Sequence, residues 1–483
     1  MFDGFIRDHA HLTPRALAVI TPASALTYAA FNADIDRFGA AVAELDIGRQ
    51  TNVVSIAMDD PVLTYVLMAA MARLRIPTSP FNDPDAEVRL IQDRSGAGTD
   101  SPGPRLITLT RDWIARVRVA PPTPLPILEI DPQAVGRVML SSGTTRTPRR
   151  VAMTWARMQA INLANICGRG ASLHGTWVPM TTVEAIQGFT LAISAWSQGA
   201  ALAGGINAPE LPAIMESRPP GLIGCTPTQL RSILTVLPAD FQPQPGWRIS
   251  VGGSRLPAGL AREARLRLTP DVRITYGATE ATINTLGLAA GLDDDPGQVG
   301  IALGGAILEF LDDHGHPVAD GQSGEIRIKG DRVADGYLND PEASTDRFRD
   351  GWFHTRDIGR RLPDGRIVLE GRVDDRMILA DVGKFMPAFL EDAALTCPGV
   401  RDVAAFAVPS TAGLDDCWLA VVTEPGFDRE DLSPHLSRYK GLPPNRFAWV
   451  DEIPRNAMGK IERTKLRDTL LAALGQSPDQ TVV

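Results

Sequence analysis

Apolar and polar residues alternate along the chain with two periods, one typical of strands and one typical of helices. In residues 1–130, short apolar runs predict strands, and longer runs with helical spacing lie between them. The predicted strands are Leu17–Ile20, Asn52–Met58 and Ile76–Ser79, and the predicted helices are Tyr28–Leu45 and Pro61–Leu74. This alternation favours a parallel sheet with helices on its faces. Residues 98–128, rich in Pro, Gly and Arg, are predicted to be a surface excursion.

The rest of the chain repeats this alternation of strands and helices, first in a long segment and then in a shorter C-terminal one. Strands are predicted at Val138–Leu140, Trp177–Met180, Gly324–Lys329 and Arg366–Leu369, and helices at Trp155–Ala171 and Val183–Trp196. Later come helices at Phe389–Leu395, Asp431–Leu436 and Thr464–Leu474, and strands at Val403–Val408 and Trp418–Thr423. Because 483 residues are too many for one compact core, we predict two α/β units. They are a large N-terminal lobe of parallel and mixed sheets with flanking helices, residues 1–373, and a small C-terminal domain, residues 374–483.

Composition and charge narrow the class of protein. The chain is 44% apolar and 22% charged, which is ordinary for a soluble globular enzyme. A net charge of −9 argues against nucleic-acid or anionic-membrane partners, because both favour a basic face. The most apolar stretch, Pro61–Leu74, is interrupted by Arg73 and is too short to span a bilayer. The N-terminus has charged residues where a signal peptide needs an apolar run, so we expect a cytoplasmic protein.

Cysteine and lysine usage adds two expectations. The four cysteines lack the paired spacing of a zinc site or disulfide framework and are predicted to be buried free thiols: Cys167, Cys225, Cys397 and Cys417. The basic residues are nearly all arginine, with lysine only at Lys329, Lys384, Lys440, Lys460 and Lys465. Few lysines together with abundant Ala, Gly and Pro indicate a GC-rich bacterial genome.

The segment from Val138 to Thr154 is a candidate phosphate-binding loop. A buried strand leads into Ser-Ser-Gly-Thr-Thr, whose hydroxyls and flexible glycine suit contact with an anion, and Arg149 and Arg150 add positive charge. Taken alone, the segment fits an ordinary polar hairpin loop equally well. It is not a Walker loop, because the Gly-Lys-Ser/Thr ending is absent and no helix pattern follows directly.

A second candidate site lies in Ile274–Thr282. A strand delivers Tyr276 and Gly277, and a hydroxyl and a carboxylate follow at Thr279 and Glu280. Glu280 supplies a hard oxygen ligand of the kind that nucleotide-bound Mg²⁺ takes, while Thr279 is placed to hydrogen-bond a phosphate oxygen. The plainer alternative is a solvent-facing glutamate after a turn.

Six motifs in order resemble those of the adenylate-forming superfamily, which includes acyl-CoA synthetases, nonribosomal-peptide adenylation domains and firefly luciferase. They are the loop after Leu140, Gly252-Gly253-Ser254, Tyr-Gly-Ala-Thr-Glu at residues 276–280, Thr-Arg-Asp at 355–357, Gly-Arg-Val-Asp-Asp at 371–375, and Pro454 to Arg463 with its Gly-Lys pair. They span nearly the whole chain. The resemblance implies a large domain followed by a small mobile one, with Asp374 as the hinge residue.

The resemblance also assigns roles to individual residues. Phosphate binding falls to Ser141, Ser142, Gly143, Thr144 and Thr145, with Arg149 in place of the family's loop lysine. Adenine and the substrate carboxylate lie against Gly252, Gly253 and Ser254, with Tyr276 stacked on adenine beside Gly277. Asp357 accepts the ribose hydroxyls, Arg372 reaches the ribose or the phosphates, Thr182 borders the acyl pocket, and Lys460 is the catalytic lysine.

The sequence departs from the family at several positions. Arg146 replaces the second glycine of the phosphate loop, Arg149 and Arg150 replace its Lys-Gly pair, and Arg356 replaces the glycine before Asp357. One extra residue precedes Pro387 in the segment that lines the pantetheine tunnel of CoA-forming relatives. Glu184, near the expected acyl pocket, is predicted to be a solvated carboxylate at a helix start.

The resemblance implies an enzyme that uses ATP and Mg²⁺ to convert a carboxylic acid to an acyl-adenylate, releases pyrophosphate, and transfers the acyl group to a thiol, most simply that of CoA. One alternative is an acyl-AMP ligase that loads the phosphopantetheine of a carrier protein. A second alternative, of a different class, is a catalytically weak nucleotide- or acyl-binding relative. The presence of both Glu280 and Lys460 argues against this second alternative.

Overall fold

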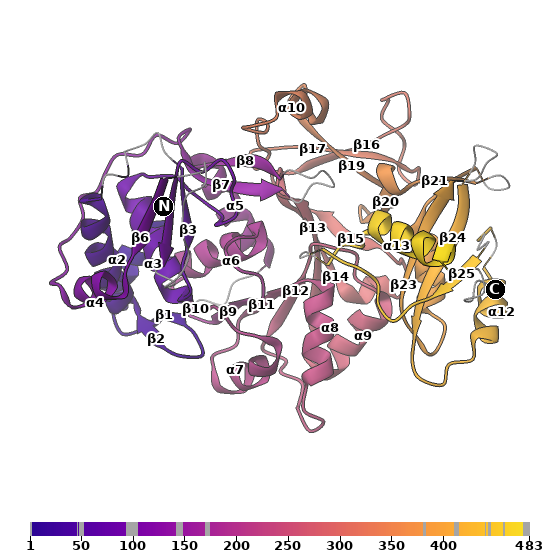
Figure 1. Ribbon diagram of the computed structural model, residues 1–483, viewed down its shortest axis with the longest axis horizontal. Coiled ribbons are helices and arrows are strands. Elements are labelled where there is room, and N and C mark those ends of the chain that lie inside the picture. The colour runs from indigo at the N-terminus through magenta and orange to yellow at the C-terminus, as the bar shows by residue number, and fades with distance from the viewer. Residues whose placement is uncertain are drawn as a thin grey trace.

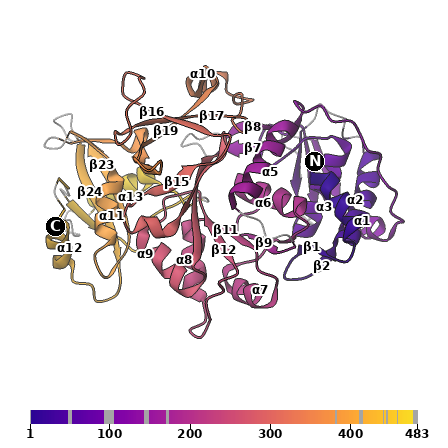
Figure 2. The ribbon, with the colours of Figure 1, turned by 180° about the vertical axis from the view of Figure 1, so that it is seen from behind.

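A computed structural model describes residues 2–45, 47, 53–92, 105–141, 148–169, 174–379, 383–409, 415–439, 441–442, 446–456 and 459–476 (Figure 1). Figures 1 and 2 show the N-terminal helices at one end of the molecule and the C-terminal elements at the other. Within these residues, the strands form one large sheet, a six-stranded sheet, a three-stranded sheet and a two-stranded ribbon. No helix in the described part of the chain is long and apolar enough to cross a membrane.

The six-stranded sheet has the order β6-β5-β3-β4-β7-β8. Its strands are β3 (Val54–Ala57), β4 (Thr78–Ser79), β5 (Val88–Gln92), β6 (Arg105–Leu109), β7 (Val135–Ser141) and β8 (Arg149–Thr154). All neighbours are parallel except β7 and β8, which form an antiparallel hairpin. The helices of this part of the chain are α1 (Phe2–Leu12), α2 (Tyr28–Ala43), α3 (Pro61–Leu74) and α4 (Arg111–Val119).

The large sheet runs in the order β16-β17-β19-β20-β15-β14-β13-β12-β11-β9-β10-β1-β2. One half contains β1 (Leu17–Ile20), β2 (Ala25–Thr27), β9 (Thr176–Pro179), β10 (Ala201–Ala203), β11 (Leu222–Cys225), β12 (Arg248–Val251) and β13 (Asp271–Ala278). The other half contains β14 (Thr282–Leu288), β15 (Gln298–Ala302), β16 (Ile307–Leu311), β17 (Gly324–Lys329), β19 (Trp352–Arg361) and β20 (Ile367–Arg372), with β18 (Phe348–Arg349) on β19. Strands β10, β9, β11, β12 and β13 are mutually parallel, so their carboxyl ends lie at one edge.

Helices bury both faces of the parallel part. One apolar core joins α1, α2, α3, α6 (Ile186–Ser197) and the start of α5 (Trp155–Arg169) to residues of both sheets. A second core lies on the opposite face of the large sheet, under α7 (Leu211–Ser217), α8 (Pro227–Val236) and α9 (Ala258–Arg267). Short turns and a helix complete this part: η1 (Ala208–Glu210), η2 (Ala289–Leu292) and α10 (Pro341–Arg347).

The C-terminal elements have apolar cores of their own. The sheet β23-β24-β25 consists of β23 (Val400–Pro409), β24 (Asp415–Thr423) and β25 (Arg446–Trp449). It packs with α11 (Pro387–Leu395) and α12 (Leu432–Leu436) on one face and with α13 (Arg463–Gln476) on the other. The remaining elements are η3 (Val373–Asp375), the ribbon β21 (Met377–Leu379) with β22 (Gly383–Phe385), and η4 (Arg429–Asp431). The predicted domain boundary falls in η3, directly after β20.

The predicted α/β class is confirmed, and most predicted elements occur within a few residues of their expected bounds. The surface excursion predicted for residues 98–128 is wrong in part, because β6 and α4 lie within it. β6 pairs in parallel with β5, and Thr110 caps α4 by accepting a hydrogen bond from the Trp113 amide at 3.1 Å. The many arginines of this segment interrupt its apolar residues, so the sequence pattern does not indicate a strand or a helix there. Helix α6 begins at Ile186, three residues after its predicted start at Val183.

Helix α6 packs closely on the chain that leaves β9. A Cβ atom at Gly188 would clash with the backbone carbonyls of Thr181 and Thr182, so glycine is required for the helix to approach this segment. Gly259, in α9, is the opposite case, because a Cβ atom there would meet nothing within 4 Å. Gly188 therefore fixes the position of Thr182, which the sequence assigned to the acyl pocket.

This contrast gives the first prediction. Gly188→Ala should lower the free energy of unfolding by about 1–3 kcal/mol, because overpacking against backbone atoms cannot be relieved by a side-chain rotation. Gly259→Ala, the matched control, should raise it by about 0.5–1 kcal/mol, because alanine is the better helix former. Urea denaturation of both variants measures the two effects. A Gly188→Ala variant as stable as the wild type would contradict the close packing.

Candidate active site

The candidate phosphate loop opens at the end of β7. Ser141, the last residue of that strand, is buried and pairs with Arg149 across the hairpin. Ser142, Gly143, Thr144, Thr145 and Arg146 lie outside the described residues. The loop therefore connects two antiparallel strands, and the absence of a directly following helix is confirmed.

The two arginines after the loop have different partners. The Arg149 Nε atom donates to Asp340 Oδ2 at 3.0 Å, and its guanidinium lies 5.2 Å from the centroid of the Tyr337 ring. Arg150 is buried, and its Nη2 atom lies 3.1 Å from Asp83 Oδ2. Arg149, whose side chain is about one-fifth exposed, is therefore the more accessible of the two, whereas Arg150 forms an internal ion pair.

Tyr337 joins Arg149 to the predicted metal ligand. The Tyr337 hydroxyl donates to Glu280 Oε1 at 2.8 Å, and burial together with the Glu280 charge raises the pKa of Tyr337. Glu280 is itself buried. The structure thus brings together Arg149 and Glu280, which are separated by more than a hundred residues, through a tyrosine that the sequence analysis did not assign to the site. Its position after the Asp-Gly pair of residues 335–336 was the available signal.

Arg157, in α5, was also missed. Its guanidinium donates to the backbone carbonyls of Thr279 at 2.9 Å and of Glu280 at 2.7 Å. It donates further to the carbonyls of Ala152 and Arg332, each at 2.7 Å. Burial lowers the pKa of Arg157 to about 10, which the nearby carboxylates oppose, so it stays charged at neutral pH. This side chain fastens the Thr279–Glu280 turn to β8.

The predicted ribose site contains three residues that are joined through Asp357. The Tyr276 hydroxyl donates to Asp357 Oδ2 at 2.7 Å, and Arg372 Nη1 donates to Asp357 Oδ1 at 3.1 Å. Burial raises the pKa of Tyr276 well above its usual value, and the Asp357 charge acts in the same direction. Gly277 follows Tyr276 in β13, so the strand that carries Tyr276 leads directly into the Glu280 turn.

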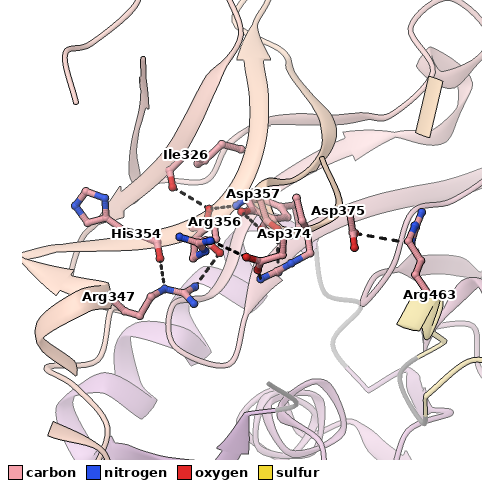
Figure 3. Close-up of polar contacts among 11 residues, drawn as sticks. Ile326, Arg347, His354, Arg356, Asp357, Asp374, Asp375 and Arg463 are labelled. Carbon is pink, nitrogen blue, oxygen red and sulfur yellow. Dashed lines mark hydrogen bonds and ion pairs between the residues drawn. The ribbon is translucent and has the colours of Figure 1, made fainter. Parts of the chain in front are cut away.

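Arg356 and the hinge residues form a chain of charges around Asp357 (Figure 3). Arg356 has a φ angle of +61°, in the left-handed region where glycine is favoured, which explains the glycine that the family has here. Its Nη2 atom bonds Asp374 Oδ1 at 2.6 Å, and Arg372 Nη2 lies 3.7 Å from Asp374 Oδ2. From the C-terminal side, Arg463 Nη1 lies 3.8 Å from Asp375 Oδ2.

The Gly-Lys motif lies against the Gly-Gly-Ser turn after β12. A Cβ atom at Gly459 would stand 2.7 Å from Thr228 Oγ1 and 3.6 Å from Ser254 Oγ. Lys460 is anchored through its backbone amide, which donates to Asn456 Oδ1 at 3.0 Å, and it is exposed. The C-terminal lysine segment and the turn formed by Gly252, Gly253 and Ser254 are therefore neighbours at the carboxyl ends of the parallel strands.

The structure corrects the predictions for Glu184, near the expected acyl pocket, and for Cys167. Thr182 is exposed, but Glu184 is not a solvated helix-start carboxylate, because it is only partly exposed and accepts a hydrogen bond from the Phe81 amide at 2.7 Å. Burial raises the pKa of Glu184, and the nearby charge of Arg137 opposes that rise. Among the cysteines, Cys167 is exposed, whereas the other three are buried as predicted. The described residues contain no group of three or more His, Cys, Asp or Glu able to hold a metal.

Comparison with known proteins identifies the central part of the chain. Residues 104–338 match the family model for AMP-binding enzymes. This central segment is therefore similar to AMP-binding enzymes. The indoleacetate–CoA ligase of Aromatoleum aromaticum is 25% identical over 522 residues, which cover 96% of this chain and 97% of that enzyme. The long-chain-fatty-acid–CoA ligase of Salmonella typhimurium is 31% identical over 226 residues, or 46% of this chain and 40% of that enzyme.

A solved structure confirms the α/β fold of the chain. ATP-bound MatB from Rhodopseudomonas palustris matches with a TM-score of 0.83 at 22% sequence identity, over 97% of this chain and 99% of that one. Together with the family match, this likeness confirms the resemblance of the six motifs to the adenylate-forming superfamily. The roles of the individual site residues stay predictions.

The buried guanidinium of Arg157 gives the second prediction. Arg157→Met should lower the free energy of unfolding by at least about 3 kcal/mol, because several buried carbonyls lose their donor. Arg356→Asn is the control, since asparagine tolerates the left-handed backbone and the lost ion pair is 36% and 41% exposed. Its effect should stay within about 1 kcal/mol. Equal losses for the two variants in urea denaturation would contradict the distinction between these arginines.

Proposed function

We propose that the protein activates a carboxylic acid with ATP to an acyl-adenylate and then transfers the acyl group to the thiol of CoA. The observation that carries this proposal is the contact of the Gly459–Lys460 segment with Thr228 and Ser254. It brings a lysine from the C-terminal elements to the carboxyl ends of the parallel strands, which is where open α/β sheets bind their ligands. The AMP-binding family match and the relatives named as CoA ligases support the same reaction class.

In the first half-reaction, a carboxylate oxygen of the acid attacks the α-phosphorus of ATP and pyrophosphate leaves. Negative charge grows on the phosphate oxygens, so the enzyme's task is to hold the reactants in line and neutralise that charge. Lys460 is exposed toward solvent beside the Ser254 turn and carries a mobile ammonium suited to this role. Arg149, at the start of β8, is a second positive group, and its pairing with Asp340 leaves Lys460 the larger share of this task.

Asp357 is proposed to bind the ribose hydroxyls. Tyr276 and Arg372 each hold one of its carboxylate oxygens, at 2.7 Å and 3.1 Å, so the carboxylate has a fixed orientation. Each carboxylate oxygen accepts more than one hydrogen bond, which leaves acceptor capacity for the ribose. Burial of Tyr276 keeps its hydroxyl protonated, and so it acts as a donor to Asp357 throughout the physiological pH range.

The residues present fit a nucleotide-bound Mg²⁺. Mg²⁺ in nucleotide sites takes one or two carboxylates and completes its shell with phosphate oxygens and water. Glu280 offers one such carboxylate, and Tyr337 orients it by bonding only its Oε1 atom among the described contacts. Bound there with ATP, the ion would neutralise charge on the phosphates. Glu280 would hold the ion, and Tyr337 would orient the Glu280 carboxylate.

The second half-reaction is proposed to follow a rotation about Asp374. In the described orientation the Lys460 segment lies beside Thr228 and Ser254, which suits the adenylation half-reaction. Rotation would withdraw Lys460 and admit the thiol, whose sulfur attacks the acyl carbonyl and expels AMP. A carrier-protein phosphopantetheine presents the same thiol chemistry and is the alternative acceptor. Pyrophosphate exchange with a panel of aryl, short-chain and medium-chain acids identifies the acid.

The third prediction concerns Glu280. Glu280→Gln should lower the rate of Mg²⁺-dependent ATP–pyrophosphate exchange by about a hundredfold or more, because a charged ligand becomes neutral while Tyr337 retains an oxygen to bond. Tyr337→Phe is the matched control: it removes the orienting hydroxyl but not the charge, and should cost about tenfold. Exchange at the wild-type rate in Glu280→Gln would exclude this carboxylate as the metal ligand.

The fourth prediction separates the half-reactions. Lys460→Ala should lower acyl-adenylate formation from acid and ATP by about a hundredfold or more, because charge on the phosphates is no longer neutralised. Thioester formation from a chemically prepared acyl-adenylate should be largely spared, since pyrophosphate has already left. Both rates are measured on one preparation with CoA, and then with a phosphopantetheinylated carrier protein, as acceptor.

Two outcomes of this experiment would count against the proposal. If both half-reactions fall together, Lys460 has a structural role or the domains do not alternate. If neither falls, the chemistry lies elsewhere. Transfer to the carrier protein but not to CoA would assign the protein to the carrier-loading alternative.

A further inference from the structure

Three buried polar atoms lie on one face of the large sheet, under α6, without a hydrogen-bond partner. They are Trp177 Nε1, Gln187 Oε1 and Ser250 Oγ. The strand register places Trp177 beside Leu222, and Ser250 beside Gly224, so these side chains share a face of neighbouring parallel strands. Buried polar atoms are nearly always paired, and the exceptions mark places where a ligand or a water supplies the missing bond.

Gln187 stands over the carboxyl ends of two of these strands. It lies in the first turn of α6, and its Nε2 atom is 3.8 Å from the point where a Cβ atom would stand at Gly224, the penultimate residue of β11. The same atom is 3.8 Å from the corresponding point at Gly252, directly after β12. Because Gly224 and Gly252 have no side chains, the Gln187 amide faces backbone there. This is the edge at which α/β sheets bind ligands.

The surroundings of Gln187 favour a neutral polar group on an otherwise apolar ligand. Leu191, on the next turn of α6, packs against Gly224 and makes this layer apolar. The two charged neighbours interact electrostatically with each other, so the charges of Glu184 and Arg137 offset one another. Glu184 also accepts from the Phe81 amide, and Arg137 donates to the Val183 carbonyl at 2.7 Å. An amine or a second carboxylate on the ligand would therefore meet a pair whose charges already compensate each other.

A hydroxyl is the neutral group that suits an amide best. Rotation of the Gln187 amide by half a turn exchanges its oxygen and nitrogen, and a hydroxyl both donates and accepts, so it bonds either arrangement. A site built to hydrogen-bond a substrate hydroxyl also rejects the analogue that lacks it, because the protein group is then left unpaired.

We propose that Gln187 is a specificity-determining residue that binds a hydroxyl group of the acid, so that the substrate is a hydroxy acid with an apolar body. This rests on the proposed acid activation. The hydroxyl would lie near the carboxylate end of the acid, since Gly252 begins the turn that the family resemblance places against that carboxylate.

The fifth prediction tests this role with pairs of acids that differ by one hydroxyl: benzoate against 2-, 3- and 4-hydroxybenzoate, and butanoate against 3-hydroxybutanoate. The wild type should use at least one hydroxylated member with a kcat/KM for ATP–pyrophosphate exchange about tenfold or more above its parent. Gln187→Leu should remove that preference while the parent acid is used as well as before or better. Gln159→Leu, the same change at an exposed position of α5, is the matched control and should keep the preference.

Stability separates a binding role from a structural one. Gln187→Leu removes an unpaired buried polar atom, so its Tm should equal or exceed that of the wild type. Gln229→Leu should instead lower the Tm, because the Gln229 amide is bonded at both ends, to Met180 and Thr226. A lower Tm for Gln187→Leu with equal loss for both members of every pair would overturn the proposal, as would a wild type that prefers every parent acid.

The failure of this inference is distinguishable from failure of the proposed function. Exchange by the wild type with unhydroxylated acids alone supports acid activation and overturns the role of Gln187. If no acid supports exchange, calorimetric binding of the same pairs to the full chain with a non-hydrolysable ATP analogue gives the second readout. Tighter binding of a hydroxylated acid that is lost in Gln187→Leu supports the role of Gln187, and equal binding overturns it.

Discussion

The arrangement of the candidate site depends on one buried guanidinium, that of Arg157. It bonds carbonyls from β8, from the Thr279–Glu280 turn and from Arg332, three segments that are far apart in the sequence. No other side chain offers donors in so fixed a fork, and each carbonyl left without a donor costs about 1–3 kcal/mol. The strand after the phosphate loop and the turn that carries Glu280 therefore behave as one rigid unit, as transition-state charge stabilisation requires.

The ion pairs around Asp374, the predicted hinge residue, are weaker than the buried contacts of Arg157. Arg356 and Asp374 are 36% and 41% exposed, and Arg463 approaches Asp375 only to 3.8 Å. Pairs of this kind contribute about 0–1 kcal/mol each, so they favour one orientation without locking it. Arg372 connects the predicted ribose site to these exposed pairs, because it bonds Asp357 and also lies near Asp374. These pairs are not the whole contact across the predicted boundary, because Arg255 also bonds Asp392 through two nitrogen atoms. The rotation that we propose would have to break that contact as well.

The sequence predicted elements and motifs better than it predicted contacts. Periodicity placed β1 and α3 at their bounds, since strands and helices of a parallel sheet bury continuous apolar runs. Arg157 and Tyr337 could not be found this way, because their roles arise from contacts between distant segments. Glu184 was misassigned for the same reason: its partner is the Phe81 amide, 103 residues away. The strand and helix within residues 98–128 were hidden by charged residues on exposed faces.

Three of the arginines that depart from the family have acidic partners, while Arg146 lies outside the described residues. Arg150 pairs with Asp83, Arg149 with Asp340, and Arg356 with Asp374, so their charges are compensated locally. These substitutions therefore add little net positive charge at the phosphates, and they do not by themselves indicate a binder without catalysis. It follows that Lys460, whose segment reaches the site from the C-terminal elements, carries a larger share of phosphate neutralisation in the proposed mechanism. Because that segment moves with the hinge in the mechanism, neutralisation is available only in the orientation that makes the adenylate, and its withdrawal clears the same space for the thiol.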